Sequence, residues 1–364
     1  MSTLSAIEIL APGAYASLQD GGRRGYRRIG VPWAGVLDPR LMRIANALAG
    51  NADSDPVIEC FDGGLQVAVR GAPLRVAVAG DAVIELEREG DRRALAAWRS
   101  VTLADGEILR IRRISGGRIA MLAVAGLAVP AVMGSASTYA RAALGGLDGC
   151  ALTKGARLAV KVASDSPERV LPHPPVADGG PIRVVPGPQA DHFSAATMEA
   201  FLTGEYRVTT EADRMGVRLE GSVLDHLGAR EIVSDATVPG SIQVPGKGQP
   251  IVLLADAQTA GGYPKIATVI SADIPRLAAC RPGQAVRFAA VSGTDGERLA
   301  RMAETATRDL LASIRPLVAD GVDVAALYSA NLVSGVVLAL TSDAGTHTPP
   351  ADPDGRPNRQ ESPT

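Results

Sequence analysis

Residues 240–270, GSIQVPGKGQPIVLLADAQTAGGYPKIATVI, decide the fold and carry the strongest functional pattern in the chain. Two apolar runs, residues 251–257 and 266–270, flank a polar loop that is rich in glycine. Runs of β-branched residues interrupted by Gly-Gly and Tyr-Pro are typical of strands joined by a specially shaped turn. If the two runs pair as a hairpin, Asp256 and Lys265 lie opposite each other at the mouth of the loop. We therefore expect a functional site there.

The composition outside this stretch is that of a globular protein. The chain has 364 residues, of which 46% are hydrophobic and 21% charged, enough for two domains of ordinary size and a substantial core. A net charge of −2 and only 3% aromatic residues give no sign of a nucleic-acid or membrane partner. Forty glycines and 25 prolines favour a mainly β architecture with many turns, although a biased coding composition would have the same effect.

The cysteines and the N-terminus indicate a cytoplasmic location. Cys60, Cys150 and Cys280 are far apart and odd in number, so we expect buried free thiols in a reducing compartment. No export signal is recognisable at the start of the chain. The longest apolar run, residues 119–134, is interrupted by glycine and proline and is too short to span a bilayer.

Turn-rich segments divide the chain into five parts. We predict an N-terminal β-rich subdomain (1–163), a Pro-rich linker (164–180), a C-terminal β-rich subdomain that contains the quoted loop (181–290), a helical extension (291–340) and a disordered tail (341–364). Short apolar runs recur in residues 65–80, 82–90 and 107–126. The alternation of Leu109 and Ile111 with arginines is typical of half-buried strands.

Local signals predict a few helices. Residues 39–49 have Asp38 as N-cap, proline at the first helical position and Gly50 at the end. Weaker signals predict helices at residues 194–202, at 273–279 and after Ser292.

Several familiar catalytic and binding motifs are absent from the sequence. There is no phosphate-binding G-x-x-x-x-G-K-[ST] motif, no G-x-S-x-G, and no Met-Lys-Met for biotin attachment. Of the four histidines, one lies in the predicted linker and one in the predicted tail. The other two, His192 and His226, are too few to form a metal site by themselves. We therefore predict no metal.

Cations gather near the N-terminus, where glycines allow a tight turn that exposes N–H groups. This segment carries Arg23, Arg24, Arg27, Arg28, Arg40 and Arg43. Arginines beside such a turn bind carboxylate or phosphate with two hydrogen bonds. The alternative is a solvated basic surface with local Asp–Arg pairs.

A second charged segment surrounds Arg214. Arg214 or Arg218 would hold an anionic substrate with Asp213 fixing the guanidinium, or the segment is a structural ion-pair corner. Lys265, displayed by the Gly-Gly-Tyr-Pro turn, would stabilise a developing negative charge, and Asp256 would transfer protons. Alternatively, Asp256 and Lys265 neutralise each other.

Five segments together resemble one family. They are SLQDGGRRGYRRIGVPWAGVLD (17–38), ANALAGN (45–51), PGPQADHF (186–193), ADRMGVRLEG (212–221) and the stretch quoted first. They resemble the biotin-dependent carboxyltransferase family, which includes the C subunit of prokaryotic 5-oxoprolinase, the Kip antagonist protein and the carboxyltransferase part of urea amidolyase. The resemblance implies a mainly β fold with a few helices (α+β), composed of two β-rich subdomains that include a cyclophilin-like β-barrel.

The patterns and the resemblance together predict a site. Its catalytic residues are Asp256, Lys265 and Arg214. Its substrate-binding residues are Gln19, Asp20, Arg23, Asp38, Asp213, Arg218, Gln243, Gln258 and Tyr263, and its turn is shaped by Gly25, Gly261, Gly262 and Pro264. The resemblance adds Glu59, Asn46 and Ser234 as secondary candidates. Ala34, Leu37 and Cys150 depart from the family's usual Ser, Met and Arg, which puts the usual substrate in doubt.

The resemblance implies an ATP-dependent complex that cleaves 5-oxoproline to glutamate. In such a complex this chain would share its site with a Kip-inhibitor-like partner, which corresponds to the B subunit of 5-oxoprolinase. It would work with a hydrolase like the A subunit on a small amide or lactam, with ATP as co-substrate. A carboxyltransferase acting on an amide or urea nitrogen, with biotin supplied by another protein, is the alternative. A regulatory binding module without catalysis is a third possibility.

Overall fold

A computed structural model describes residues 5–161, 167–176 and 178–317. The chain up to Leu317 forms one compact unit. The predicted tail (341–364) and most of the predicted extension beyond Leu317 lie outside the described residues. The prediction of a mainly β fold with a few helices is confirmed, because the described residues contain four α-helices among many strands.

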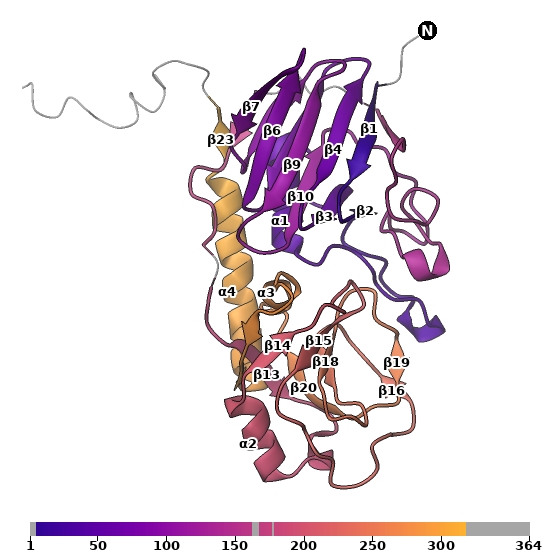
Figure 1. Ribbon diagram of the computed structural model, residues 1–364, viewed down its shortest axis with the longest axis vertical. Coiled ribbons are helices and arrows are strands. Elements are labelled where there is room, and N and C mark those ends of the chain that lie inside the picture. Colours follow the sequence, from indigo (N-terminus) through magenta and orange to yellow (C-terminus); the bar gives the residue numbers. More distant parts are fainter. Residues whose placement is uncertain (1–4, 162–166, 177, 318–364) are drawn as a thin grey trace, which may run out of the picture. The chain divides into compact units, whose positions relative to one another are not determined.

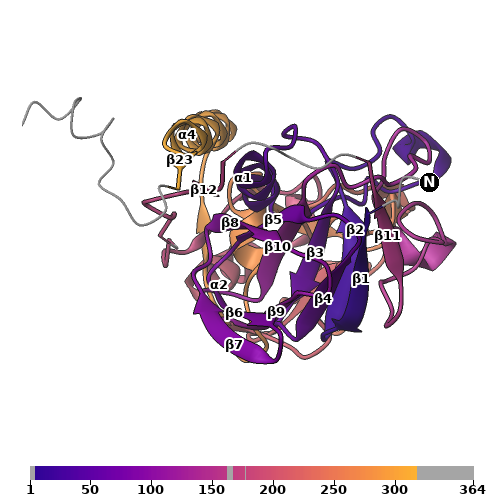
Figure 2. The ribbon, with the colours of Figure 1, turned by 90° about the horizontal axis from the view of Figure 1, so that it is seen from above.

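Two antiparallel sheets, built mainly from the first half of the chain, face each other (Figure 2). The six-stranded sheet has the order β11 (Arg157–Val160), β1 (Ser5–Pro12), β4 (Leu65–Arg70), β9 (Ile108–Ile114), β6 (Ala82–Arg88) and β7 (Asp91–Leu95). The seven-stranded sheet has the order β2 (Tyr15–Gln19), β3 (Val57–Phe61), β10 (Ile119–Val124), β5 (Leu74–Ala79), β8 (Arg99–Leu103), β12 (Arg169–Val170) and β23 (Arg315–Pro316). In β9 the predicted alternation is confirmed, since Leu109 and Ile111 are buried and Arg112 is exposed.

The predicted linker (164–180) contributes to a sheet. Its residues Arg169–Val170 form β12, which pairs with β8 on one side and with β23 on the other. Arg169 also donates a hydrogen bond to the Ala47 carbonyl. The described part of this segment therefore belongs to the seven-stranded sheet, beside its edge strand β23.

The second half of the chain forms a nearly closed barrel. Its eight strands have the order β21 (Ala285–Val286), β14 (Tyr206–Val208), β15 (Gly216–Glu220), β18 (Ile251–Leu253), β17 (Ser241–Gln243), β20 (Lys265–Val269), β13 (Ile182–Pro186) and β22 (Phe288–Ala290). The two edge strands, β21 and β22, are consecutive and only Arg287 separates them, so the sheet must curl until its edges approach each other. Strands β16 (Asp235–Ala236) and β19 (Ala260–Gly261) form a separate small pair.

Four α-helices pack beside these sheets, close to the positions predicted from the sequence (Figure 1). They are α1 (Pro39–Ala49), α2 (Ala195–Thr203), α3 (Ile274–Ala278) and α4 (Gly293–Ala312), with short 3-10 helices η1 (Arg27–Ile29), η2 (Ala140–Ala142) and η3 (Ala190–His192). The Asp38 carboxylate caps α1 by accepting hydrogen bonds from the N–H groups of Arg40 and Leu41, and Gly50 ends it at φ +90°. Figure 2 shows α1 on the outer side of the seven-stranded sheet.

One hydrophobic cluster joins the two halves. It contains Ile44 of α1, Met121 of β10 and Val184 of β13, whereas a second cluster fills the space between the two N-terminal sheets. The prediction of buried thiols is correct for Cys60 and Cys280 but wrong for Cys150, which is exposed in the loop after η2. Burial raises the pKa of the Cys60 thiol to about 12 and that of Cys280 to about 11.

Candidate functional site

Arg214 lies at the centre of a buried ion cluster that links distant parts of the chain. Its Nε and Nη2 donate to the two carboxylate oxygens of Asp256 at 3.0 and 2.9 Å. Its Nη1 donates to Glu59 on β3, and its Nη2 also donates to the Gly35 carbonyl at 2.5 Å. In this region, residues 15–37 and strand β3 contact the loops that carry Arg214 and Asp256. We call this region the junction.

Glu59 is fully buried in this cluster and balances the charge of Arg214. Its second oxygen accepts a hydrogen bond from the Leu37 N–H at 2.7 Å. Burial raises the pKa of Glu59, although Arg214 and the Leu37 N–H act in the opposite direction. Burial by itself would lower the pKa of Arg214, but Glu59 and Asp256 together raise it. A guanidinium with two carboxylates and a carbonyl is fully engaged, so Arg214 fits the role of a positioning residue.

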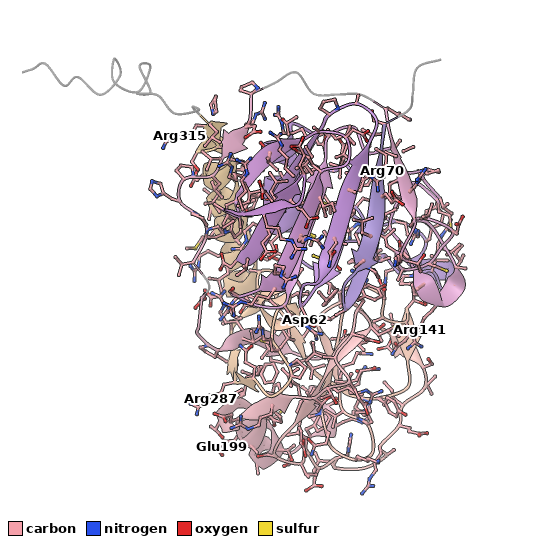
Figure 3. The ribbon with its side chains drawn as sticks, turned by 45° about the horizontal axis from the view of Figure 1, so that its top comes forward. Asp62, Arg70, Arg141, Glu199, Arg287 and Arg315 are labelled. Carbon is pink, nitrogen blue, oxygen red and sulfur yellow. The ribbon has the colours of Figure 1, made fainter. Side chains whose placement is uncertain are left out.

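A further contact supports the junction nearby. Arg118 forms an ion pair with Asp62, 2.9 Å apart, and donates to the Ala212 carbonyl at 3.3 Å. Asp62, labelled in Figure 3, immediately follows β3. The segment that precedes Arg214 is thereby held against the N-terminal sheets.

Lys265 does not face Asp256, and the expected hairpin is wrong. Strand β17 lies between β18 and β20, and Gln243 of β17 is the register partner of Lys265. The buried Lys265 Nζ binds the Asp235 carboxylate at 2.7 Å, and this hydrogen bond lowers the pKa of Asp235. Gln189 donates to the same carboxylate oxygen at 3.1 Å. Asp235 is about half exposed, with 48% of its side chain accessible, so the pair reaches the surface.

Arg23 is also completely buried, but it has no acidic partner in the part of the chain that the structure describes. Its Nη2 donates to the Ser137 carbonyl, while Nε and Nη1 have no hydrogen-bond partner among the described residues. Within the same described residues, no carboxylate lies at ion-pair distance from it. Burial lowers the pKa of Arg23, although the more distant Asp20 and Asp256 oppose this effect.

Asp20, predicted to bind substrate, instead fastens two loops together. Its carboxylate accepts hydrogen bonds from the Gly22 N–H (2.8 Å), the Ser135 hydroxyl (2.5 Å), the Ala136 N–H (2.6 Å) and the Ser137 hydroxyl (2.6 Å). These four donors occupy the carboxylate, so it does not pair with the neighbouring Arg23.

A second polar group lies where η1 meets the barrel. Arg27 donates to the Thr237 carbonyl, and the Thr237 hydroxyl donates to the Gln258 carbonyl. The Gln258 side chain in turn donates from Nε2 to Oε1 of the Gln243 side chain at 3.3 Å. In the part of the chain that the structure covers, Nη1 of Arg27 and Nε2 of Gln243 are buried without partners. Burial lowers the pKa of Arg27.

The remaining predicted residues serve turns and caps or lie at the surface. Asp213 accepts from the N–H groups of Met215 and Gly216, so it shapes the turn and does not fix the Arg214 guanidinium as predicted. Arg218 is exposed and pairs with Glu211 at 3.0 Å. Two of the other residues belong to helix α1, which Asp38 caps and in which Asn46 is buried, whereas Tyr263 and Ser234 are exposed. The residues predicted to shape the turn are Gly25, which takes φ +91°, and Gly261, which packs against Gln243. The Gly262 carbonyl accepts a hydrogen bond from the Ile232 N–H, and Pro264 is buried.

Sequence reasoning predicted Gln19 but missed two other polar residues on the same strand, Tyr15 and Ser17. Tyr15, Ser17 and Gln19 alternate on β2 with residues that enter the hydrophobic core, and Ser17 pairs in register with Glu59. Burial raises the pKa of the Tyr15 hydroxyl. The period-two pattern of polar residues was the available signal, because one face of a strand that is polar and buried marks an internal polar site.

A large groove is lined mostly by residues outside the junction. Its volume is about 1840 Å³, and α1, α3, α4 and the loop after β9 contribute to its lining. Of the predicted site residues, Asp38 lines it. We base the candidate site on the buried charges of the junction, since charge and hydrogen bonding determine chemistry and volume does not. Within the described ranges, no group of three His, Cys, Asp or Glu side chains is arranged to hold a metal ion. None of the helices in those ranges is long and apolar enough to cross a membrane.

Comparisons with known proteins show which family the chain belongs to. Residues 29–290 match the family described as carboxyltransferase domain, subdomain A and B. The C subunit of 5-oxoprolinase from Escherichia coli is 37% identical over 283 residues, which cover 78% of this chain and 90% of that protein. The C subunit from Haemophilus influenzae is 37% identical over 300 residues, 82% of this chain and 95% of that protein.

A solved structure shows the same fold within a longer enzyme. The K. lactis urea amidolyase structure superimposes with a TM-score of 0.74 at 26% identity, over 84% of this chain but 20% of that one. This chain therefore spans a fifth of the length of that enzyme. The resemblance predicted from the five sequence segments is confirmed: the chain belongs to the carboxyltransferase domain family, subdomains A and B.

Proposed function

We propose that this chain is a subunit of an ATP-dependent, 5-oxoprolinase-like complex that hydrolyses an amide bond. In the net reaction, 5-oxoproline, ATP and two molecules of water give glutamate, ADP and phosphate. One observation carries the proposal: the matched region covers 90% of the C subunit of E. coli 5-oxoprolinase, so the likeness extends over nearly that whole protein.

The buried charges of the junction fit such chemistry. A lactam carbonyl is a poor electrophile, and activation of its oxygen with phosphate creates negative charge that cations must stabilise. Arg23 has donors available for an anion. Lys265 would stabilise this negative charge only after Asp235 moves, because its Nζ already binds the Asp235 carboxylate. Arg214, Asp256 and Glu59 would hold the segments that form the pocket in place, and Asp256 would move a proton only if its pair with Arg214 opened.

The complex requires other subunits. We propose a Kip-inhibitor-like partner, like the B subunit of 5-oxoprolinase, that shares the site. A hydrolase like the A subunit would complete the complex, with ATP bound together with these partners. The relatives are named as one of several lettered subunits of 5-oxoprolinase, which supports an assembly of several chains. An ATP-consuming reaction of this kind would run in the cytoplasm.

The direct test is reconstitution. The purified chain, mixed with its two partner subunits, 5-oxoproline and ATP, should release ADP and glutamate in equal amounts. Mixtures that lack this chain or lack 5-oxoproline are the controls. If ADP release does not depend on 5-oxoproline when all subunits are present, the proposal fails.

Carboxyl transfer to an amide or urea nitrogen is the second candidate. The superposition on urea amidolyase favours it. In that reaction biotin would arrive on another protein and the same cations would hold a carboxylate. Urea-dependent consumption of ATP and bicarbonate, seen only after a biotin carboxylase and a biotinylated carrier are added, would support this function in place of the first.

A further inference from the structure

Four buried polar atoms without partners lie around one short segment, Ser137–Thr138. They are Nε and Nη1 of Arg23, Oε1 of Gln19 and Oγ1 of Thr138, counted among the residues that the structure describes. Gln19 Nε2 donates to the Thr138 carbonyl at 3.2 Å, and Arg23 Nη2 donates to the preceding carbonyl, that of Ser137. The Thr138 N–H donates to the Leu18 carbonyl at 2.9 Å, so the segment runs beside β2.

These atoms are unsatisfied although their side chains are already held in place. Arg23, Gln19 and Thr138 are at most 1% exposed. A buried cation without a counter-charge is costly, and each buried polar atom without a partner is unfavourable as well. Asp20, the nearest acid along the chain, is occupied by its four donors. Arg23 is thus a fixed, desolvated cation with donors to spare.

The chemistry of the four atoms is complementary to a specific kind of ligand. The two Arg23 nitrogens are donors and match a carboxylate. The Gln19 oxygen is an acceptor and matches an N–H group, while the Thr138 hydroxyl serves as either. A small molecule that carries a carboxylate next to an amide N–H would satisfy all of them.

A loop with strained residues packs directly against the side chains of Arg23 and Thr138. A Cβ built at Gly145 would overlap the Ser137 carbonyl and lie 2.6 Å from Arg23 Nη2, and one built at Gly146 would overlap the Thr138 hydroxyl. The same loop holds three non-glycine residues at positive φ, namely Met133, Ala143 and Asp148. Such strained residues gather at functional sites. Figure 3 labels Arg141 of η2 in this loop.

We infer that Arg23, Gln19 and Thr138 form a binding subsite for a lactam that carries a carboxylate, under the loop of residues 133–149. Arg23 binds the carboxylate and Gln19 accepts the ring N–H, and entry of the ligand requires the loop to move aside. The inference rests on the proposed function and deepens it. It assigns the substrate's carboxylate to Arg23, whereas Arg214 holds the surrounding segments in place as part of the structural frame of the junction. Urea, which has no carboxylate, would not fill this subsite.

The test is calorimetric titration of the full-length chain with three probes. They are 5-oxoproline, 2-pyrrolidinone, which lacks the carboxylate, and cyclopentanecarboxylate, which lacks the N–H. Wild type should bind 5-oxoproline about tenfold or more tightly than either analogue, since a charged hydrogen bond is lost with one and a neutral one with the other. Titrations in which wild type binds nothing are repeated with the partner subunits present.

Variants assign the contacts. Arg23→Gln should weaken 5-oxoproline binding about tenfold or more and abolish the preference over 2-pyrrolidinone. The affinity of Arg23→Lys for 5-oxoproline should lie between those of wild type and Arg23→Gln, because lysine keeps the charge but lacks the planar guanidinium group. Gln19→Leu should abolish the preference over cyclopentanecarboxylate. The matched control is Arg24→Gln, since Arg24 belongs to the same motif but is exposed, with its guanidinium 4.1 Å from the Trp33 ring centroid.

The outcomes separate this subsite from the proposed function. If Arg23→Gln binds 5-oxoproline like wild type, or if wild type does not discriminate among the probes even with its partners, ordered water satisfies these atoms and the subsite is wrong. If the reconstituted complex turns over 5-oxoproline but Arg23→Gln leaves KM unchanged, the function stands without the subsite. If wild type selects the carboxylate but no ADP is released, the subsite stands without the function.

Discussion

Arg214 and Arg23 are both buried arginines at the junction, yet their surroundings are opposite. Arg214 binds Asp256, Glu59 and a carbonyl, whereas Arg23 binds a single carbonyl and no acid within the described residues. The first region is complete without a ligand and the second is not. Proteins violate the rule of paired buried charges mainly where function requires it. The difference therefore separates the part of the junction that holds the fold from the part that we propose as a ligand subsite.

The largest expected effect is the loss of Arg214. Arg214→Gln would leave the carboxylates of Asp256 and Glu59 buried without a counter-charge, so the free energy of unfolding should fall by about 3–5 kcal/mol. Urea denaturation measures the change. Arg218→Gln is the control on the adjacent strand, and because Arg218 is exposed its effect should stay within about 0.5 kcal/mol. If both variants behave alike, Arg214 does not hold the junction together.

A buried acid–arginine pair outside the junction gives the next largest effect. Asp273 is fully buried and accepts hydrogen bonds from the Arg183 N–H (2.7 Å), Nε (2.8 Å) and Nη2 (2.6 Å). Burial would raise the pKa of Asp273, but the hydrogen bonds from Arg183 and the ion pair with Arg276 together outweigh it, and the pKa is lowered. Its stabilising contribution is therefore present above the unfolded pKa of about 3.9 and is lost as the pH falls through the lower folded value.

Asp273→Asn should remove this contribution. At pH 7 the variant should lose about 1–3 kcal/mol of unfolding free energy, and between pH 4 and 2 its stability should fall less steeply than that of wild type. The midpoints of urea denaturation, measured for both proteins across this pH range, test the predicted direction of the change in stability. Asp91→Asn, an exposed substitution on β7, is the control. A variant with the same acid slope as wild type would contradict the assigned pKa direction.

The pair of Lys265 and Asp235 should matter less to stability. Because Asp235 is about half exposed, water replaces the lost contact, and Lys265→Met should change the unfolding free energy by only about 0–1 kcal/mol. If Lys265 neutralises charge during the reaction, kcat of the reconstituted complex should nevertheless fall by about a hundredfold. An unchanged kcat would limit Lys265 to a structural ion pair.

Features set by neighbouring residues could be predicted from the sequence. Helix α1 begins and ends at the predicted residues because Asp38, Pro39 and Gly50 act locally on the backbone. The mainly β fold was likewise predictable, since alternation along one strand, as at Leu109 and Ile111, depends on that strand alone.

Contacts between distant segments could not be predicted. The interposed strand β17 separates the runs that were expected to pair, and nothing in the loop sequence indicates it. Lys265 therefore binds Asp235, thirty positions earlier, and Arg214 reaches Glu59, which is 155 positions away. The family motif identified Arg23 and Gln19, but Thr138, more than a hundred residues from either, came only from the structure. Pairing at such separations depends on topology, which local patterns do not encode.

Arg23→Gln is expected to change stability as little as Lys265→Met, and it is the sharpest test of the comparison. Arg23→Gln removes the hydrogen bond to Ser137, worth about 1–3 kcal/mol for a charged donor, but it also removes a buried charge that has no partner, and the two effects offset each other. The unfolding free energy without ligand should therefore change by less than about 1 kcal/mol. Thermal and urea denaturation of Arg23→Gln beside Arg214→Gln provide the measurement. A loss as large as that of Arg214→Gln would mean that Arg23 supports the fold in the same way, and the division of the junction into a frame and a ligand subsite would have to be abandoned.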